Sequence, residues 1–286
     1  MDTTIMYGLP AANHIRNELQ QTVTELKDQR ITPKISVVII GDHPASQTYV
    51  RIKKKAAEKI GMEADIIQRE STITQDELLR IIDHLNHDPN THGILVQLPL
   101  PEQINDHAIL ERISPEKDVD GFHPINMGRL AVGEDAFYPC TPFGIMKLLD
   151  FYGIDVARQH VVIVGRSHIV GKPVGQMMLN QDATVTYCHS KTEDLSYYTS
   201  QADILIVAVG RAHLIGQQDV KKGAVVVDVG NSFQPSGEVL GDVNFDDLQQ
   251  HASFITPVPK GVGPMTITML LYNTVKAAKR LMNEGD

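Results

Sequence analysis

The second half of the sequence repeats a short apolar run followed by a longer amphipathic stretch, and this rhythm restricts the fold more than any other feature. The apolar runs are HVVIVG (160–165), ATVTYC (183–188), ADILIVAVG (202–210) and GAVVVDVG (223–230). Buried strands of a parallel sheet have this length and this richness in Val and Ile, and the intervening segments are long enough for helices. The pattern predicts an α/β domain of the dinucleotide-binding type.

The first half shows a similar alternation and predicts a second α/β domain. Its predicted strands are KISVVIIG (34–41), EADIIQR (63–69) and GILVQLPLP (93–101), the last stopped by prolines. Its predicted helices cover 11–29, a segment that begins near Pro44, and 74–86 with Thr74 as the N-cap. A linking helix, TPFGIMKLLDFYG, follows, and a last helix over 264–282 is predicted to pack back on the first domain. Domain boundaries are therefore expected at 140 and near 264.

Composition excludes several classes of function. The 286 residues carry a formal net charge of -9, which argues against sequence-independent binding to nucleic acid or to an anionic membrane. Cys140 and Cys188 are the two cysteines, so no disulfide framework is expected, and reduced thiols suit the cytosol. The start, MDTTIMYGLP, lacks the basic and apolar regions of a secretory signal. A cytoplasmic protein without nucleic-acid or membrane partners is expected.

The segment VVIVGRSHIVGKPVG has the form of a phosphate-binding loop between a strand and a helix. Gly165 and Gly171 allow a tight turn at a helix N-terminus, where free N–H groups and the helix dipole favour phosphate. Five residues separate these glycines and Pro173 follows Lys172, so the P-loop of ATPases is excluded. Ser167 stands where the second glycine of a G-x-G-x-x-G fingerprint would be. The strand alternation still favours dinucleotide binding.

The residues near this loop favour NADP over NAD. Domains specific for NAD usually offer a carboxylate near the end of the second strand for the ribose 2′-hydroxyl. Here that strand ends in YCHSKT, with Ser190 and Lys191 and no acid before Glu193. Arg166 lies in the loop itself, and a guanidinium with a hydroxyl suits a 2′-phosphate. The alternative is that Arg166 is only a surface cation.

The helix that begins near Pro44 contains three consecutive lysines, and one of them lies on an unusual face. On a 3.6-residue period, Ser46, Tyr49, Lys53, Ala56 and Ile60 form one stripe. A lysine among an isoleucine, an alanine and a tyrosine can simply extend its apolar stem along the core with its amine in water. It can also hold that amine in a site. Residue spacing alone favours the first interpretation.

Taken together, VGRSHIVGKPVG, ATVTYCHSKT, KDVDGFHPINMGRL, GILVQLPLP, YPCTPFGI and TPVPKGVGPMT resemble the bifunctional methylenetetrahydrofolate dehydrogenase/cyclohydrolase family, called FolD in bacteria. The resemblance covers essentially the whole chain in order and spacing. It implies a homodimer in one-carbon metabolism, with a folate-binding catalytic domain (1–140 and 264–286), a Rossmann-like NADP domain (141–263), and a cleft between them. Oxidation of 5,10-methylenetetrahydrofolate by NADP+ and hydrolysis of the methenyl product to 10-formyltetrahydrofolate are the implied reactions, without a metal.

The resemblance also implies roles for single residues. Lys53 matches the catalytic lysine, four residues after Tyr49; Gln97 matches the glutamine of VQLPLP; and Asp120 matches the pterin-binding aspartate of KDVDG. Tyr49 is expected to stack on the folate, Gln97 to orient the lysine or the attacking water, and Asp120 to accept pterin N–H groups. Because a free lysine has a pKa of about 10.4, Lys53 is expected to need partial burial, which lowers that pKa and yields a neutral amine.

The cofactor-binding residues expected in the NADP domain form one set: Gly165, Arg166, Ser167, Ser190 and Asn231. Pro264, at the start of the last helix, is assigned to the folate-binding residues together with Tyr49, Lys53, Gln97 and Asp120. Lys260 stands where most relatives are expected to have glycine, so the backbone of that loop is uncertain from sequence.

Each of these assignments has a structural alternative when the residues are taken alone. Tyr49 is equally compatible with a core position, and Gln97 with a residue that only satisfies strand-end groups. Asp120 lies in DVDG, which is also good turn chemistry. Histidines 84, 87 and 92 suggest a metal site only weakly, because helix-end and loop histidines are commoner. Both cysteines are interpreted as reduced and structural.

The sequence disfavours three alternatives to the bifunctional enzyme. A dehydrogenase that has lost the hydrolytic step is disfavoured because Tyr49, Lys53 and Gln97 are all present. A dinucleotide sensor without chemistry is disfavoured by Lys53 and Asp120, and an amino-acid dehydrogenase by the folate-side segments.

Overall fold

The computed structural model describes residues 2–234 and 237–283, and the chain divides into two compact units. The three-stranded unit comprises His14–Cys140 and the chain from Ile267 on. The six-stranded unit comprises Thr141–Thr266 and the chain up to Asn13, which joins it because β1 (Thr4–Ile5) pairs with β11 (Phe254–Ile255). The functional division into 1–140 with 264–286 and 141–263 stays a prediction, and residues 1 and 284–286 lie outside the described residues.

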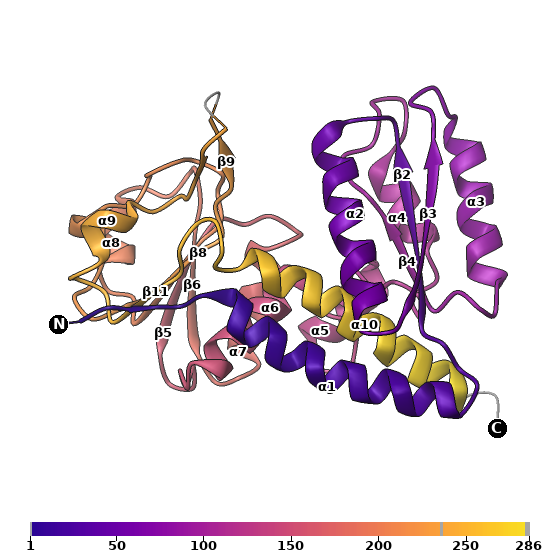
Figure 1. Ribbon diagram of the computed structural model, residues 1–286. Helices are drawn as coiled ribbons and strands as arrows, with labels where there is room; N and C mark the ends of the chain where they lie inside the picture. The colour runs from indigo at the N-terminus through magenta and orange to yellow at the C-terminus, as the bar shows by residue number, and fades with distance from the viewer. Residues whose placement is uncertain (1, 235–236, 284–286) are drawn as a thin grey trace. The chain divides into compact units, whose positions relative to one another are not determined.

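The three-stranded unit is built on a parallel sheet of order β3-β2-β4. Its strands are β2 (Lys34–Ile40), β3 (Glu63–Arg69) and β4 (Gly93–Val96). Every residue of β2 after Lys34 is buried, as a central strand covered on both faces requires. The helix α2 (Pro44–Lys59) covers one face, and α3 (Gln75–His87) with α4 (Asp106–Arg112) covers the other (Figure 1).

The predicted strands and helices of this unit are present, with one difference in length. Thr74 caps α3 as predicted: its hydroxyl accepts from the Glu77 N–H, and its own N–H donates to the Glu77 carboxylate at 2.9 Å. β4 ends at Val96, five residues before the end of the predicted run. The Gln97 N–H still donates to the Val38 carbonyl at 2.8 Å. The prolines beyond it have no N–H for a ladder, so the chain leaves the sheet there.

The six-stranded unit has a parallel sheet of order β1-β11-β8-β7-β5-β6. Its four predicted strands are present as β5 (His160–Val164), β6 (Thr184–Cys188), β7 (Ile204–Val207) and β8 (Val225–Asp228). The outer strands β1 and β11 were not predicted because each has only two residues, too few to show a pattern. The sequence-based prediction of a Rossmann-like domain is confirmed.

The strand order creates a switch point at β5. The chain runs from β5 to β6 on one side of it, and then to β7 on its other side. In open parallel sheets, ligands bind beyond the carboxyl ends of the strands at such a point. The loops that follow β5 and β7 are therefore the expected place for a nucleotide.

The last helix, α10 (Gly263–Asn283), contacts α1 (Gly8–Asp28), as predicted: the Arg16 side chain donates to the Thr268 hydroxyl at 2.9 Å.

The remaining elements are α5 (Pro124–Ala131), α6 (Cys140–Phe151), α7 (Gly171–Leu179), α8 (Leu195–Thr199), a 3₁₀ turn (Gln217–Asp219), β9 (Ser232–Phe233), β10 (Val239–Leu240) and α9 (Phe245–Leu248). Within the described part of the chain, no helix has the length and apolar character required to cross a bilayer.

Candidate functional site

Lys53 and Gln97 meet in the three-stranded unit. Lys53 lies in the third turn of α2, and Gln97 is the first residue after β4. The Lys53 amine donates a hydrogen bond of 2.9 Å to the Gln97 side-chain oxygen. Because Gln97 also uses its side-chain NH₂ group to bind the Leu98 carbonyl at 2.8 Å, its amide orientation is set and its oxygen faces the lysine. Gln97 therefore satisfies a strand-end group and holds the amine.

Lys53 lies at the border of the buried face of α2. Val50 and Ala57 are the buried residues of this helix, while the Lys53 side chain is half-buried. The predicted stripe thus lies at the edge of the core and not at its centre. Burial lowers the pKa of Lys53, and the negative charge of Asp120 acts against that change. The amine gives up its proton more readily than a surface lysine.

Tyr49 is exposed over 41% of its surface, so the interpretation of this residue as core is wrong. It lies one helical turn before Lys53, and side chains at this spacing project from the same side of a helix. A large aromatic ring kept partly in water beside a half-buried amine is suited to stacking on a flat ligand.

The sequence allows Asp120 to stabilise a turn or to bind a ligand. In the structure, Asp118 stabilises the turn and Asp120 does not. The Asp118 carboxylate accepts the backbone N–H groups of Gly121, Phe122 and His123, at 3.1, 3.3 and 2.8 Å, and the Asn126 amide at 2.9 Å. Asp118 therefore does the turn chemistry that DVDG suggested. The contacts of Asp120 are with side chains instead, namely the thiol of Cys140 and the charge of Lys53.

The electrostatic state of Asp120 is unusual for a carboxylate. Burial raises its pKa to about 6, the Lys53 charge lowers it, and the neighbouring Asp118 raises it. The Cys140 thiol contacts it and lies 3.3 Å from the Val119 carbonyl. Burial also raises the pKa of Cys140 well above its usual value, with the Asp120 charge acting in the same direction. Cys140 is therefore a protonated thiol that can donate a hydrogen bond, and it is free of any disulfide.

Asn273 of α10 holds the Asp120 loop and was missed by sequence reasoning. Its side-chain NH₂ donates to the Val119 carbonyl at 2.9 Å and to the Tyr138 carbonyl at 3.0 Å. Gly121 fits the same loop because its φ is +76° and a Cβ there would lie 2.5 Å from the Tyr138 backbone. Asn273 lies 153 residues after Asp120 in the sequence, so no local pattern reveals its role.

In the six-stranded unit, the loop between β5 and α7 has the backbone expected of a phosphate site. Gly165 has φ +125°, and a Cβ there would lie 2.3 Å from the Ala208 carbonyl oxygen; a Cβ on Gly171 would lie 2.3 Å from the Gly165 oxygen. The Ser167 hydroxyl accepts the N–H groups of Val170 and Gly171, at 3.2 and 3.3 Å. It still has its own proton to donate, so Ser167 both shapes the loop and can contact an anion.

Arg166 and Ser190 follow neighbouring strands and are both exposed. Val164 of β5 is paired with Cys188 of β6, so their loops leave the same edge of the sheet side by side. Asp194, an acid beyond β6, caps α8 by accepting the Tyr197 N–H at 3.2 Å. Asn231 is exposed and follows β8 by three residues, also at the carboxyl edge.

Pro264 lies in the first turn of α10, in the six-stranded unit. The residues that the sequence groups as folate-binding are thus not all in one unit, because Tyr49, Lys53, Gln97 and Asp120 belong to the three-stranded unit. Upstream of Pro264, Lys260 has φ +91°, a conformation that favours glycine. The backbone of this loop thus keeps the shape that glycine permits, at the cost of strain at a lysine.

Of histidines 84, 87 and 92, the last two make hydrogen bonds to the backbone. The ring of His87 contacts the Asp83 carbonyl at 2.6 Å, and the His92 ring accepts the Lys34 N–H at 3.2 Å. Over residues 2–234 and 237–283, no group of three or more His, Cys, Asp or Glu side chains could hold a metal ion.

Comparison with known proteins finds a family match for each of two parts of the chain. Residues 6–120 match a family described as the tetrahydrofolate dehydrogenase/cyclohydrolase catalytic domain, and residues 139–282 match its NAD(P)-binding domain. The bifunctional protein FolD of Bacillus subtilis is 57% identical over 283 residues, which is 99% of this chain and all of that protein.

Solved structures agree. The bifunctional FolD enzyme of Campylobacter jejuni is 51% identical with a TM-score of 0.96, over 97% of this chain and 99% of that one. The Trypanosoma brucei enzyme, solved with NADP cofactor and an inhibitor, is 38% identical with a TM-score of 0.93, over 98% of both chains.

Proposed function

Because the chain belongs to the tetrahydrofolate dehydrogenase/cyclohydrolase family, we propose that Lys53, Gln97 and Asp120 carry its folate chemistry and that its cofactor is NADP. The chain is a bifunctional enzyme of folate one-carbon metabolism. It oxidises 5,10-methylenetetrahydrofolate to the 5,10-methenyl cation and hydrolyses that cation to 10-formyltetrahydrofolate. The proposals below concern which residues perform these steps.

Lys53 is the proposed base of the hydrolytic step. Water must lose a proton as it adds to the methenyl carbon, and a neutral amine can accept it. Burial lowers the pKa of Lys53, so more of the amine is neutral than on a free lysine. The positive charge of the methenyl substrate disfavours the ammonium form further. Gln97 holds the amine through an uncharged oxygen, so it positions Lys53 without stabilising the ammonium as a carboxylate would.

Asp120 and Tyr49 are the proposed binding groups for the pterin. The N–H groups of the turn donate to Asp118, so the oxygens of Asp120 are not needed to accept them. Its carboxylate is thus suited to accept N–H groups of the pterin ring. The partly exposed ring of Tyr49 is suited to stack on it.

The observation that carries this proposal is the 2.9 Å contact between the Lys53 amine and the Gln97 oxygen. Two absorbance assays on the purified protein test it. One follows methenyl formation with NADP+, and the other follows methenyl decay without cofactor. Gln97→Leu is expected to slow the decay, since the amine loses its positioning contact. Equal decay rates for Gln97→Leu and the unaltered enzyme would contradict the proposed role.

The preference for NADP is proposed from Arg166 and Ser190. Bound NADP+ supplies the hydride acceptor of the oxidation. The guanidinium and the hydroxyl follow adjacent strands at one sheet edge, a suitable pair for a 2′-phosphate. Gly165 and Ser167 would receive the pyrophosphate at the start of α7, and Asn231 and Pro264 are the other proposed ligand contacts.

Titration of the protein with NADP+ and with NAD+ tests this preference. Arg166→Ala is expected to weaken NADP+ binding far more than NAD+ binding, because only NADP+ has the 2′-phosphate. Equal losses for the two nucleotides would refute it. Arg158→Ala, a change at another arginine of the same unit, is the control for lost surface charge.

A homodimer through the edge strand β3 is also proposed. Among the residues that the structure describes, β3 pairs only with β2, since it ends the order β3-β2-β4. The Glu63 N–H and the Arg69 carbonyl make hydrogen bonds on the β2 side of the strand. Because backbone groups alternate between the two sides of a strand, the N–H groups of Ile66 and Gln68 point away from β2. Beside this edge lies a groove of about 1010 Å³, lined by isoleucines 66, 67, 73 and 81, with arginines 69 and 80 and glutamates 70 and 77.

A second copy of this chain fits such an edge. A strand that pairs with its own copy across a two-fold axis must do so antiparallel, and mixed charges can then pair reciprocally. Gln68→Pro removes one outward N–H and is expected to shift the mass measured by light scattering toward the monomer. Gln68→Ala keeps that N–H and should remain dimeric. A monomeric unaltered protein would exclude the proposal.

A cytoplasmic location is proposed from Cys140 and Cys188, both buried and neither in a disulfide. Cell fractionation with an antibody to the protein tests it, and recovery from an oxidising compartment would contradict it.

A further inference from the structure

Two buried aspartates bind the loops that follow the carboxyl ends of β7 and β8 and are not used in the function described above. Asp228 is the last residue of β8 and is 3% exposed, and Asp242 is 0% exposed. Over the described residues, no lysine or arginine forms an ion pair with either carboxylate. Two buried acids without a cation require another source of stabilisation.

Backbone N–H groups provide that stabilisation. Asp228 accepts the N–H groups of Gly230, Asp242 and Val243, at 2.8, 3.0 and 2.9 Å. Asp242 accepts those of Val209, Gly210 and Arg211, at 2.7, 3.0 and 2.7 Å. The two carboxylates thus bind six N–H groups, which come from three separate loops.

Only a carboxylate suits these positions. Each accepts three N–H groups with two oxygens, whereas an asparagine has one oxygen and would turn its NH₂ toward the remaining donors. The space is equally restricted: a Cβ on Gly230 would lie 2.5 Å from an Asp242 oxygen, and one on Gly241 would lie 2.0 Å from an Asp228 oxygen. Burial raises the pKa of Asp228 to about 6, and the three N–H groups act against that rise.

The loops held in this way border the predicted nucleotide site. Val209–Arg211 follow β7, which lies beside β5 at the switch point. A Cβ on Gly165 would lie 2.3 Å from the Ala208 oxygen and 3.5 Å from the Val209 side chain, so the glycine of the phosphate loop rests on this segment. Gly230, held by Asp228, is followed directly by Asn231.

We propose that Asp228 and Asp242 are positioning residues for the dinucleotide: by binding the N–H groups of the loops after β7 and β8, they set the backbone on which Gly165 and Asn231 meet the cofactor. They act through the backbone and touch no ligand atom. The inference rests on the proposed nucleotide site and extends it to residues that neither motif nor exposure marks.

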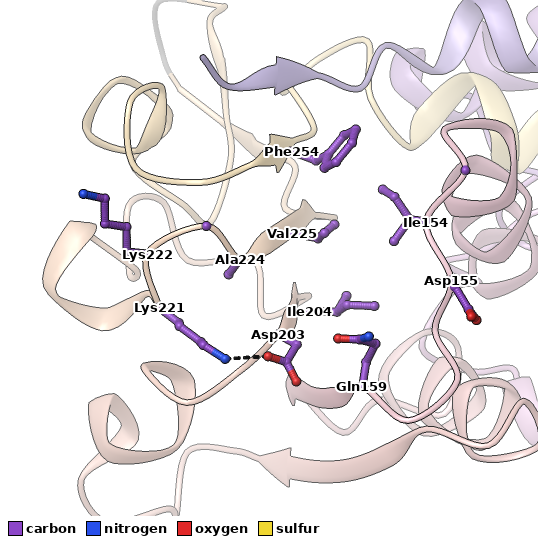
Figure 2. Close-up of a pocket in the computed structure, with 12 residues that line it drawn as sticks. Ile154, Asp155, Gln159, Asp203, Ile204, Lys221, Lys222, Ala224, Val225 and Phe254 are labelled. Atoms are coloured by element: carbon purple, nitrogen blue, oxygen red, sulfur yellow. Dashed lines mark hydrogen bonds and ion pairs between the residues drawn. The ribbon is translucent and has the colours of Figure 1, made fainter. Parts of the chain in front are cut away.

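Asp203 offers a matched control in the same unit. It precedes β7, at the amino edge of the sheet, where its carboxylate accepts the His160 N–H at 2.9 Å and the Lys221 amine at 2.6 Å. This edge borders a hollow of about 310 Å³ into which Ile204, Val225 and Phe254 project (Figure 2). Asp203→Asn therefore removes a carboxylate from the end of the sheet opposite to the predicted nucleotide site.

The experiment measures nucleotide affinity, both activities and thermal stability in Asp228→Asn, Asp242→Asn and Asp203→Asn. For Asp228→Asn and Asp242→Asn, the Kd of NADP+ and that of NAD+ should each rise about tenfold or more, the scale of one lost charge-assisted hydrogen bond. Equal losses for both nucleotides are expected because the backbone, not the 2′-phosphate contact, has changed. Cofactor-free methenyl hydrolysis should stay within about twofold, since its residues are in the other unit. Asp203→Asn should lower stability without this loss of affinity.

Two results would overturn the inference. One is unchanged nucleotide affinity in both variants; the other is a loss of affinity in Asp203→Asn as large as theirs for the same loss of stability. If the variants do not fold, amide hydrogen exchange on the unaltered protein decides instead. Slow exchange at Val209, Gly210, Arg211 and Gly230 without nucleotide supports the inference, and rapid exchange refutes it. If the unaltered protein binds neither nucleotide, the proposed cofactor site is refuted. The exchange measurement is made without nucleotide, so its result does not depend on that site.

Discussion

Asp120 in the three-stranded unit and Asp228 in the six-stranded unit have the same raised pKa, about 6, and the same main cause, burial. Their surroundings differ. Asp228 gives its oxygens to three backbone N–H groups, whereas Asp120 faces a lysine and a thiol. A perturbed pKa therefore does not separate a binding group from a scaffold group. The hydrogen-bond partners do: backbone partners mark a carboxylate that supports the fold, and ionisable side-chain partners mark one that can meet a ligand.

The same contrast occurs within three residues of the sequence. Asp118 accepts three backbone N–H groups and an amide, and Asp120 accepts none of these four. In DVDG, Asp118 stabilises the turn through hydrogen bonds, and the turn in turn positions Asp120. Mutations that separate stability from activity test this distinction.

Loss of the amine at position 53 is expected to have the largest effect. Lys53→Met keeps the apolar stem at the border of the core and removes the proposed base, so cofactor-free methenyl hydrolysis should fall by about 10²- to 10⁴-fold. The control is Lys54→Met, since Lys54 is the next lysine of the same helix and pairs at 3.7 Å with Glu58. Full turnover in Lys53→Met would contradict the proposed chemistry.

The two acids of DVDG should respond in opposite ways. Asp118→Asn leaves buried N–H groups without an acceptor and should lower the free energy of unfolding by about 1–3 kcal/mol. Asp120→Asn removes a carboxylate that burial disfavours, so stability should stay equal or rise while the KM for the folate rises about tenfold or more. Urea unfolding and steady-state kinetics measure the two quantities. The reverse pattern would show that Asp120, and not Asp118, supports the turn.

The stability of Asp120→Asn relative to the unaltered protein should depend on pH. The pKa of Asp120 is about 6 in the folded chain and about 3.9 in an unfolded one. Because the folded pKa is raised, the stability that protonation of Asp120 contributes is present below about pH 3.9 and is lost as the pH rises through about 6. The free energy of unfolding of Asp120→Asn, minus that of the unaltered protein, should therefore be larger at about pH 8 than at about pH 5. A constant difference in unfolding free energy would show that the pKa is not raised.

The smallest effect is expected in the loop of the six-stranded unit that ends at α10. Lys260→Gly relieves a side chain at φ +91° and should raise the free energy of unfolding by about 1 kcal/mol. Lys260→Ala keeps the Cβ and the strain, so it should give no such gain. Thermal unfolding of both variants measures the difference, and equal melting temperatures would exclude strain at this position.

Much of the fold was predictable because it depends on local spacing. The strands from β2 to β8, the capping of α3 by Thr74, and the helix that carries Lys53 follow from apolar period, cap residues and proline positions. The glycines of the phosphate loop were also predictable, since Gly165 and Gly171 stand at a strand-to-helix turn where a Cβ does not fit. These are properties of residues that are close in the sequence.

The partners of single side chains were decided only by the tertiary structure. The Lys53 amine is held by Gln97, 44 residues away, and the Asp120 loop by Asn273 of the last helix. The pairing of β1 with β11, about 250 residues apart, was equally invisible. Apolar periodicity sets which elements form, because it depends on neighbours in the chain. The DVDG segment alone does not show that Asn273 holds its loop or that Asp120 faces Lys53, because these partners come together only when distant segments fold onto one another.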